Sequence, residues 1–145
     1  MQRARNQENS AAHTADFRDT ASRLLHFVRE NEPLTFPEVL GSLRAQTAPW
    51  RLVIAARPWI VLWDEMSEAT ATLLAHLLST QKLALQICRS ELYDISNVKP
   101  KLPTAHSISA RGPADLWLPC TISSGPGECL NADWAIAFNC RISSN

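Results

Sequence analysis

The sequence is poor in glycine, has no net charge and lacks the common phosphate-binding motifs. Only four of its 145 residues are glycine, and none belongs to a GxxxxGK[ST] or GxGxxG loop. Fourteen basic residues balance fourteen acidic ones, so no overall field attracts the chain to a polyanion. Nucleotide-dependent chemistry is therefore not expected, and any nucleic-acid site has to be a local patch.

Long hydrophobic runs are also missing. Residues 1–15 are polar and lack the apolar centre of a secretory signal, and no window approaches the roughly 20 apolar residues that a membrane-spanning helix needs. We therefore expect an intracellular, cytoplasmic protein that does not associate with membranes. In a reducing compartment its four cysteines are expected to be thiols.

Apolar residues make up 46% of the chain, which is enough for one ordinary domain. Residues 1–14 have no apolar periodicity and are predicted to be a disordered lead-in. Residues 15–97 carry the regular hydrophobic patterns of the main domain. Residues 98–145 are rich in proline and glycine, so we expect an irregular extension packed on the same domain.

Two helices are predicted in the first third of the chain. Apolar residues follow helical spacing from Phe17 to Val28 and predict a helix over residues 16–31. Thr35 and Glu38 have the spacing of a capping box, which predicts a second helix over 36–45.

The middle of the chain alternates between strand and helix patterns. Strands are predicted at 50–55 and 59–63, followed by a helix over 67–80 that Ser67 caps. Leu83–Ile87 and Leu92–Ile95 are then predicted to pair as a hairpin. Two further apolar segments, 116–118 and 134–138, are expected to dock on the core as short strands.

The order of these elements resembles a winged helix-turn-helix. The resemblance rests on helices 16–31, 36–45 and 67–80, on hairpin 83–96, and on the passage Leu77-Leu78-Ser-Thr-Gln-Lys-Leu83 between the last helix and the hairpin. The resemblance implies an α+β fold: a winged-helix-like core of three helices and a β-hairpin, with extra strands before the third helix. Winged-helix proteins insert that helix into the major groove. By analogy, the contacting residues would be Thr70, Thr72, His76, Lys82 and Arg89. A parallel βαβ unit built from 59–63, 67–80 and 83–87 is the alternative topology.

Enzymatic and metal chemistry have little support in the sequence. Asp64 and Glu65 end an apolar run as magnesium-binding acids do in ATPases, but no phosphate loop accompanies them. The cysteines lack the CxxC spacing typical of zinc sites, and no GxSxG marks a nucleophile. A zinc site formed by Cys120, Cys129, Cys140 and His106 remains conceivable. We expect a non-enzymatic protein without metal or cofactor.

Two functions remain. The favoured one is a small regulator that binds nucleic acid through its winged-helix-like domain and local basic patches. Its candidate phosphate-binding residues are Arg44, Arg51, Arg57, Lys82, Arg89, Lys99 and Lys101.

The alternative is a protein-interaction module, an adaptor or an inhibitor of a larger machine, with no nucleic-acid affinity of its own. It is suggested by the neutral charge, by the absence of Arg and Lys from the exposed face of helix 67–80, and by five tryptophans, which are favoured at interface hot spots. Its candidate contact residues are Trp50, Thr72, His76 and Trp117, and a homodimer is also possible in principle.

Overall fold

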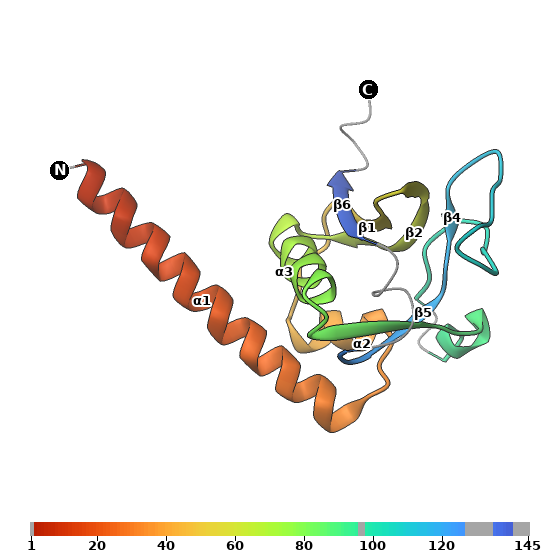
Figure 1. Ribbon diagram of the computed structural model, residues 1–145, viewed down its shortest axis with the longest axis horizontal. Coiled ribbons are helices and arrows are strands. Elements are labelled where there is room, and N and C mark those ends of the chain that lie inside the picture. The colour runs from red at the N-terminus through yellow and green to blue at the C-terminus, as the bar shows by residue number, and fades with distance from the viewer. Residues whose placement is uncertain (1, 96–97, 127–134, 141–145) are drawn as a thin grey trace.

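Three α-helices, a 3₁₀ turn and two β-sheets form a mixed α+β fold (Figure 1). The computed structural model describes residues 2–95, 98–126 and 135–140, with side chains described from residue 16 onward. The elements in chain order are α1 (Gln2–Asn31), α2 (Phe36–Ser42), β1 (Trp50–Ile54), β2 (Arg57–Met66), α3 (Glu68–Ser79), β3 (Leu83–Ile87), η1 (Ser90–Tyr93), β4 (Leu116–Trp117), β5 (Cys120–Ser124) and β6 (Ile136–Cys140).

The larger sheet has the order β4-β2-β1-β6. Strands β1 and β2 form an antiparallel hairpin around the turn at Ala55–Ala56, and β6 pairs antiparallel with the other edge of β1. Strand β4 lies parallel to β2. The strands predicted at 50–55 and 59–63 are confirmed in place, and β2 is longer than its apolar run because it begins at Arg57 and continues to Met66.

The smaller sheet corrects the predicted hairpin. Strand β3 pairs antiparallel with β5, with Leu83 opposite Ser124 and Ile87 opposite Cys120. Residues 90–93 form η1, and Tyr93 turns its fully buried ring into the core. The physical reason is that β5 offers β3 a buried partner, whereas pairing with 92–95 would withdraw Tyr93 from the core. The wing of a winged helix is therefore absent from the described residues.

The parallel βαβ alternative is also not formed, because β2 and β3 belong to different sheets. The proline-rich part of the chain supplies β4, β5 and β6, so it contributes strands to both sheets. Trp134, which was expected in the last strand, lies outside the described residues.

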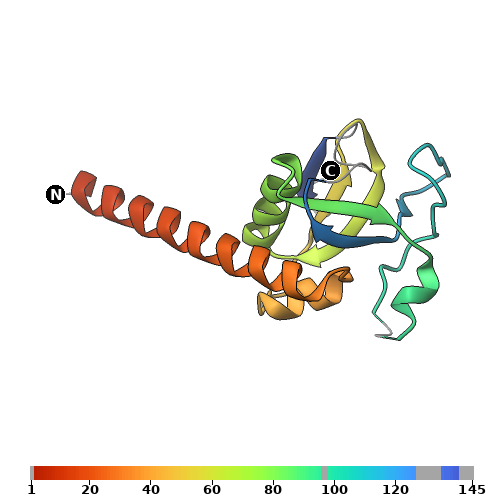
Figure 2. The same ribbon diagram turned by 60° about the horizontal axis from the view of Figure 1, so that its bottom comes forward.

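The helices follow their predicted caps. The Glu38 carboxylate accepts from the backbone N–H of Thr35 at 3.0 Å and from its hydroxyl at 2.9 Å, and the Ser67 hydroxyl accepts from the N–H of Thr70 at 3.2 Å. Helix α2 ends at Ser42, three residues earlier than predicted. Helix α1 begins at Gln2, where a disordered lead-in was expected, and its first half projects from the body in Figures 1 and 2.

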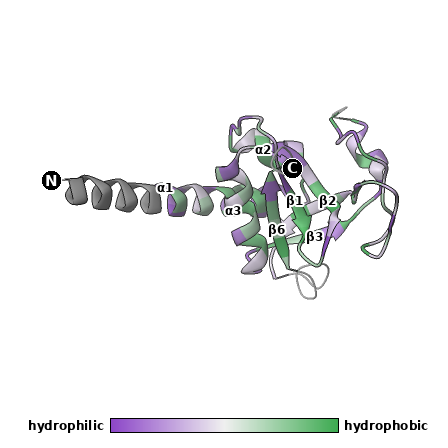
Figure 3. Ribbon diagram, turned by 90° about the horizontal axis from the view of Figure 1, so that it is seen from above, coloured by the Kyte–Doolittle hydropathy of each residue, from purple (hydrophilic) through white to green (hydrophobic). Residues whose placement is uncertain are grey.

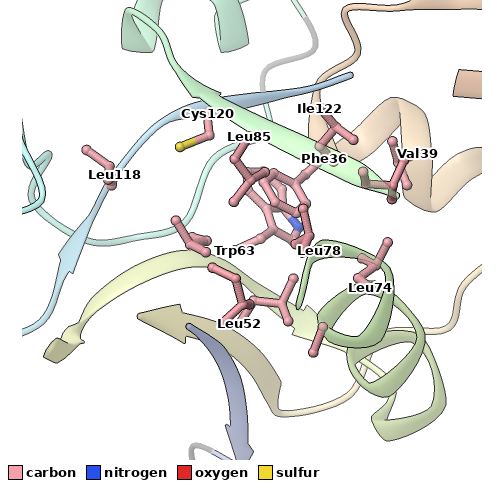
Figure 4. Close-up of a cluster of buried hydrophobic side chains, with 14 of the residues drawn as sticks. Phe36, Val39, Leu52, Trp63, Leu74, Leu78, Leu85, Leu118, Cys120 and Ile122 are labelled. Carbon is pink, nitrogen blue, oxygen red and sulfur yellow. The ribbon is translucent and has the colours of Figure 1, made fainter. Parts of the chain in front are cut away.

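The core lies between the two sheets and is closed by α3 and α2 (Figure 4). Hydrophobic residues run through β1 and β6 in Figure 3. At its centre Trp63 stacks on Phe36, with ring centroids 5.5 Å apart and planes 5° from parallel. Tyr93 and Trp117 pack around the same indole at 5.4 and 6.1 Å. Among the described residues, no helix combines the length and hydropathy needed to cross a membrane.

Candidate interaction surface

A pocket of about 250 Å³ opens where the end of α2, the end of β2 and the segment 98–100 meet. We call it the Trp63 pocket, after its only tryptophan. Its lining mixes apolar residues with two basic and two acidic side chains. The lining residues are Pro37, Leu40, Gly41, Arg44, Ala45, Gln46, Thr47, Trp63, Asp64, Glu65, Val98, Lys99 and Pro100.

Trp63 is held rigidly at this pocket. Its side chain is packed against Phe36 and Tyr93, so the residue is only 4% exposed. A ring fixed in this way loses no rotamer freedom when a ligand binds beside it. The pocket is therefore preorganised at this wall.

The end of α2 places Arg44 at the pocket in a left-handed conformation. The N–H of Ala45 donates to the C=O of Leu40 at 3.0 Å, and the N–H of Arg44 donates to the C=O of Gly41 at 3.1 Å. This is a Schellman motif, whose left-handed position is normally glycine. Arg44 occupies it with φ 51°, at a cost of about 1 kcal/mol for a residue that has a Cβ.

Gly41 lies in the last turn of the same helix and also lines the pocket. A Cβ built there meets nothing within 4 Å, so the space does not require glycine. Glycine within a helix costs roughly 0.5–1 kcal/mol relative to alanine. The chain thus has glycine where a side chain would fit and arginine where glycine would be favoured, and both residues face the same pocket.

A bulge in β2 forms the opposite wall. Trp50 pairs with Met66 and Leu52 with Trp63, so one residue of β1 lies opposite both Asp64 and Glu65. Bulges redirect side chains. Asp64 is buried, whereas Glu65 is exposed and has a left-handed backbone with φ 61°.

The residue opposite the bulge is Arg51, which the sequence analysis placed among the phosphate-binding residues. The structure instead buries it to 7% exposure. Its guanidinium pairs with Asp115 at 2.7 Å and lies 3.9 Å from Asp64, while its buried Nε has no hydrogen-bond partner among the described residues. A buried, paired charge holds β1, β2 and the start of β4 together, and it is not available to a phosphate.

Arg44 separates the Trp63 pocket from a second hollow of about 520 Å³ between α1 and the end of α2. That hollow is lined by Thr20, Arg23, Leu24, Phe27, Ser42, Leu43 and Arg44. Arg23 pairs with Asp19, one turn earlier on α1. Arg44 itself has no ion pair among the described residues. It therefore carries an uncommitted positive charge between two neighbouring hollows.

The exposed large hydrophobic residues of the described structure all fall between the last residue of β3 and residue 98. They are Ile87, Leu92, Ile95 and Val98, with exposures of 42%, 47%, 93% and 49%. We call this stretch, without its undescribed residues 96–97, the 87–98 segment. Val98 also lines the Trp63 pocket, so the segment and the pocket adjoin.

The start of the 87–98 segment borders a further cavity of about 650 Å³, which contains Cys88 and His106. Burial raises the pKa of the Cys88 thiol, whereas a nucleophilic cysteine needs a lowered pKa. Within the part of the chain that the structure describes, Cys88 and His106 share no hydrogen bond. The geometry gives no support to cysteine catalysis here.

The other predicted basic residues lie on different elements. Lys99 lines the Trp63 pocket and pairs with Asp94. Arg89 lines the Cys88 cavity, and Lys82 follows the end of α3. The remaining two are Arg57, half-buried at the start of β2, and Lys101, which is exposed.

The predicted partner-binding residues differ in exposure. His76 and Thr72 are exposed on α3, and the His76 ring packs edge-on against Phe17 of α1 at 5.6 Å. Trp50 is half-buried against Phe138 of β6. Trp117 is only 1% exposed, so it belongs to the core and offers no surface to a partner.

Among the described residues, no group of three or more His, Cys, Asp or Glu side chains is placed to hold a metal ion. Cys129, one member of the conceivable zinc set, lies outside them. Cys120 is fully buried in β5.

Sequence reasoning missed the Trp63 pocket. The pattern that could have revealed it is Gly41-Ser42-Leu43-Arg44 at the end of a predicted helix, with glycine inside the last turn and arginine beyond it. Comparisons with protein-family models, with curated proteins and with solved structures found no match.

Proposed function

We propose that the protein is a non-enzymatic protein-interaction module that binds a partner through the 87–98 segment and the adjoining Trp63 pocket. The observation that carries this proposal is that the exposed large hydrophobic residues of the described structure are confined to that one segment. Exposed large apolar side chains that are close together along the chain, rather than dispersed over it, can contribute to a single interaction site. The adjoining Trp63 pocket adds a hollow lined by apolar and charged residues next to that segment.

A nucleic-acid-binding regulator has less support. Arg51 is buried and Lys99 is already paired, while phosphate neutralisation provides much of the affinity for DNA. The exposed positions of α3 include Glu68, Thr72 and His76 but no Lys or Arg. The winged-helix analogy also loses weight, because β3 pairs with β5 rather than with a neighbouring wing strand.

The test compares the wild-type protein with the double variant Leu92→Ser, Ile95→Ser as baits in lysate of cells that express the protein. Both side chains are substantially exposed, so the thermal midpoint should stay within about 2 °C of wild type. We expect at least one partner to be recovered several-fold less by the variant, as measured by quantitative mass spectrometry.

Ser79→Ala, an exposed change at the end of α3, is the matched control and should recover the same proteins as wild type. Equal recovery by wild type and the double variant would contradict the proposal. Binding to mixed-sequence duplex DNA, with a log-log salt slope of about 0.9 per phosphate contact, would favour the regulator instead.

A further inference from the structure

Three residues that line the Trp63 pocket are unfavourable for the backbone conformation at their positions. Arg44 and Glu65 have positive φ without being glycine, and Gly41 is a glycine where a Cβ would have room. Positions at which a chain departs from local preference are expected at functional sites. We propose that the Trp63 pocket is a peptide-binding site that takes an apolar side chain, and that Arg44 pairs with a neighbouring carboxylate of the same peptide. This inference rests on the proposed function and specifies its ligand.

The size and surroundings of the pocket favour a peptide. A volume of about 250 Å³ is below the roughly 300–1,000 Å³ of typical small-molecule sites and suits one anchoring side chain. A second hollow of about 520 Å³ continues on the other side of Arg44. An extended ligand that crosses Arg44 uses both hollows, whereas a compact molecule uses one.

The charges favour an acidic residue beside the anchor. Of the other charged residues that line the pocket, Lys99 is paired with Asp94, Asp64 lies beside the buried Arg51, and Glu65 is exposed on the opposite wall. Arg44 has no ion pair among the described residues and lines both hollows. An arginine at such a position can bind a carboxylate through two parallel hydrogen bonds. The apolar anchor would contact Leu40, which lines the pocket next to Gly41.

Gln81 provides an internal control. It follows α3 as Arg44 follows α2, with φ 60° and the same pair of capping bonds, from Gln81 N–H to Leu78 C=O at 3.1 Å and from Lys82 N–H to Leu77 C=O at 2.9 Å. A polar residue at this helix position is therefore not by itself a mark of function. Arg44 differs from Gln81 because it lines the pocket together with Gly41 and Glu65.

The experiment selects a phage-displayed library of random dodecapeptides on the purified full-length protein, and measures binding of the enriched synthetic peptides by fluorescence anisotropy. We expect enriched peptides to share an apolar residue close to Asp or Glu. Gly41→Leu, which fills the pocket, and Arg44→Glu, which reverses the charge, should each weaken binding at least tenfold. Arg44→Lys should retain part of the affinity, and Gln81→Gly should leave it unchanged.

Thermal melts of each variant verify folding, and Gly41→Ala, with a smaller side chain, gives a second measurement should Gly41→Leu fail to fold. Failure to enrich any peptide, or equal binding by wild type, Gly41→Leu and Arg44→Glu, overturns the inference. Another outcome is that peptides bind Gly41→Leu and Arg44→Glu as tightly as wild type but bind the double variant Leu92→Ser, Ile95→Ser more weakly. That result overturns the pocket inference and supports the proposed function. If no peptide is enriched but the double variant loses partner recovery, the pocket inference is likewise overturned and the proposed function is supported.

Discussion

At the scale of single residues, helix α2 begins with a cap formed by neighbouring residues and ends with a backbone conformation that opposes local preference. Thr35 with Glu38, and Ser67 with Thr70, form the expected caps because each hydrogen bond joins residues already close along the chain. Glycine is the usual signal for a left-handed helix end. Arg44 takes that conformation without the signal, so the bend that forms one side of the Trp63 pocket was not predicted.

Arg44→Gly should stabilise the protein. Replacing a left-handed residue that has a Cβ by glycine removes about 1 kcal/mol of backbone strain, which corresponds to a rise of about 3 °C in the thermal midpoint. Differential scanning calorimetry measures this change. Gln81→Gly is the matched control and should give a similar rise. A lower midpoint for Arg44→Gly would mean that the arginine side chain makes stabilising contacts that outweigh the strain.

Glu32 should make the free energy of unfolding depend on pH in the acidic range. Its carboxylate accepts hydrogen bonds from the hydroxyl and the backbone N–H of Ser124, and these bonds lower its pKa, with a smaller contribution from Arg29. A pKa that is lower in the folded state gives a contribution that is present at neutral pH and is lost as the pH falls through the folded value.

The test measures urea denaturation of wild type and Glu32→Gln from pH 7 to pH 3. The variant should be the less stable protein at pH 7, and the difference should shrink as the pH falls below about 4. Ser124→Ala removes the hydroxyl partner of this carboxylate. Its difference in stability from wild type should also shrink as the pH falls. A difference that is independent of pH would show that the carboxylate charge does not act through Ser124.

At the scale of elements, the sequence predicts where strands lie better than which strands pair. Strand β3 occurs as predicted, but its partner β5 is more than thirty residues away and is chosen by burial, not by proximity. Leu92–Ile95 has a strand-like pattern, yet its middle contains Tyr93, whose hydroxyl donates to the C=O of Cys120 and accepts from the N–H of Phe36. Such long-range bonds leave no trace in local periodicity.

Tyr93→Phe should therefore destabilise the junction of η1, β5 and α2. The ring is retained, but the hydrogen bond to Cys120 and the acceptor for the buried N–H of Phe36 are lost. Leaving buried polar groups unsatisfied costs roughly 1–3 kcal/mol each, and we expect a total loss of about 2 kcal/mol in chemical denaturation. Leu92→Ala, at a neighbouring exposed position, should change stability by less than about 0.5 kcal/mol.

At the scale of the whole molecule, the early and late parts of the chain build each sheet together. Strands β1, β2 and β3 pair with β6, β4 and β5 respectively, and Leu34, just before α2, bridges to Ile122 of β5. Composition predicts a main domain at 15–97 with an irregular extension packed on it, because proline and glycine interrupt regular elements after residue 97. Short strands such as β4 survive between prolines because their partners are already in place.

A fragment of residues 1–97 should consequently fail to fold. It would lose every partner strand except the β1–β2 hairpin, and it would expose the faces of Leu85, Trp63 and Leu52 that pack within the common core. Isolated hairpins are marginal in water. We expect an NMR amide spectrum without dispersion and a gradual thermal transition. The matched control removes residues 1–15 instead and should melt cooperatively near the full-length midpoint, because Phe17 is the first residue described as packing against the core. Cooperative unfolding of the 1–97 fragment would show that the early elements hold their arrangement without the strands that pair with them.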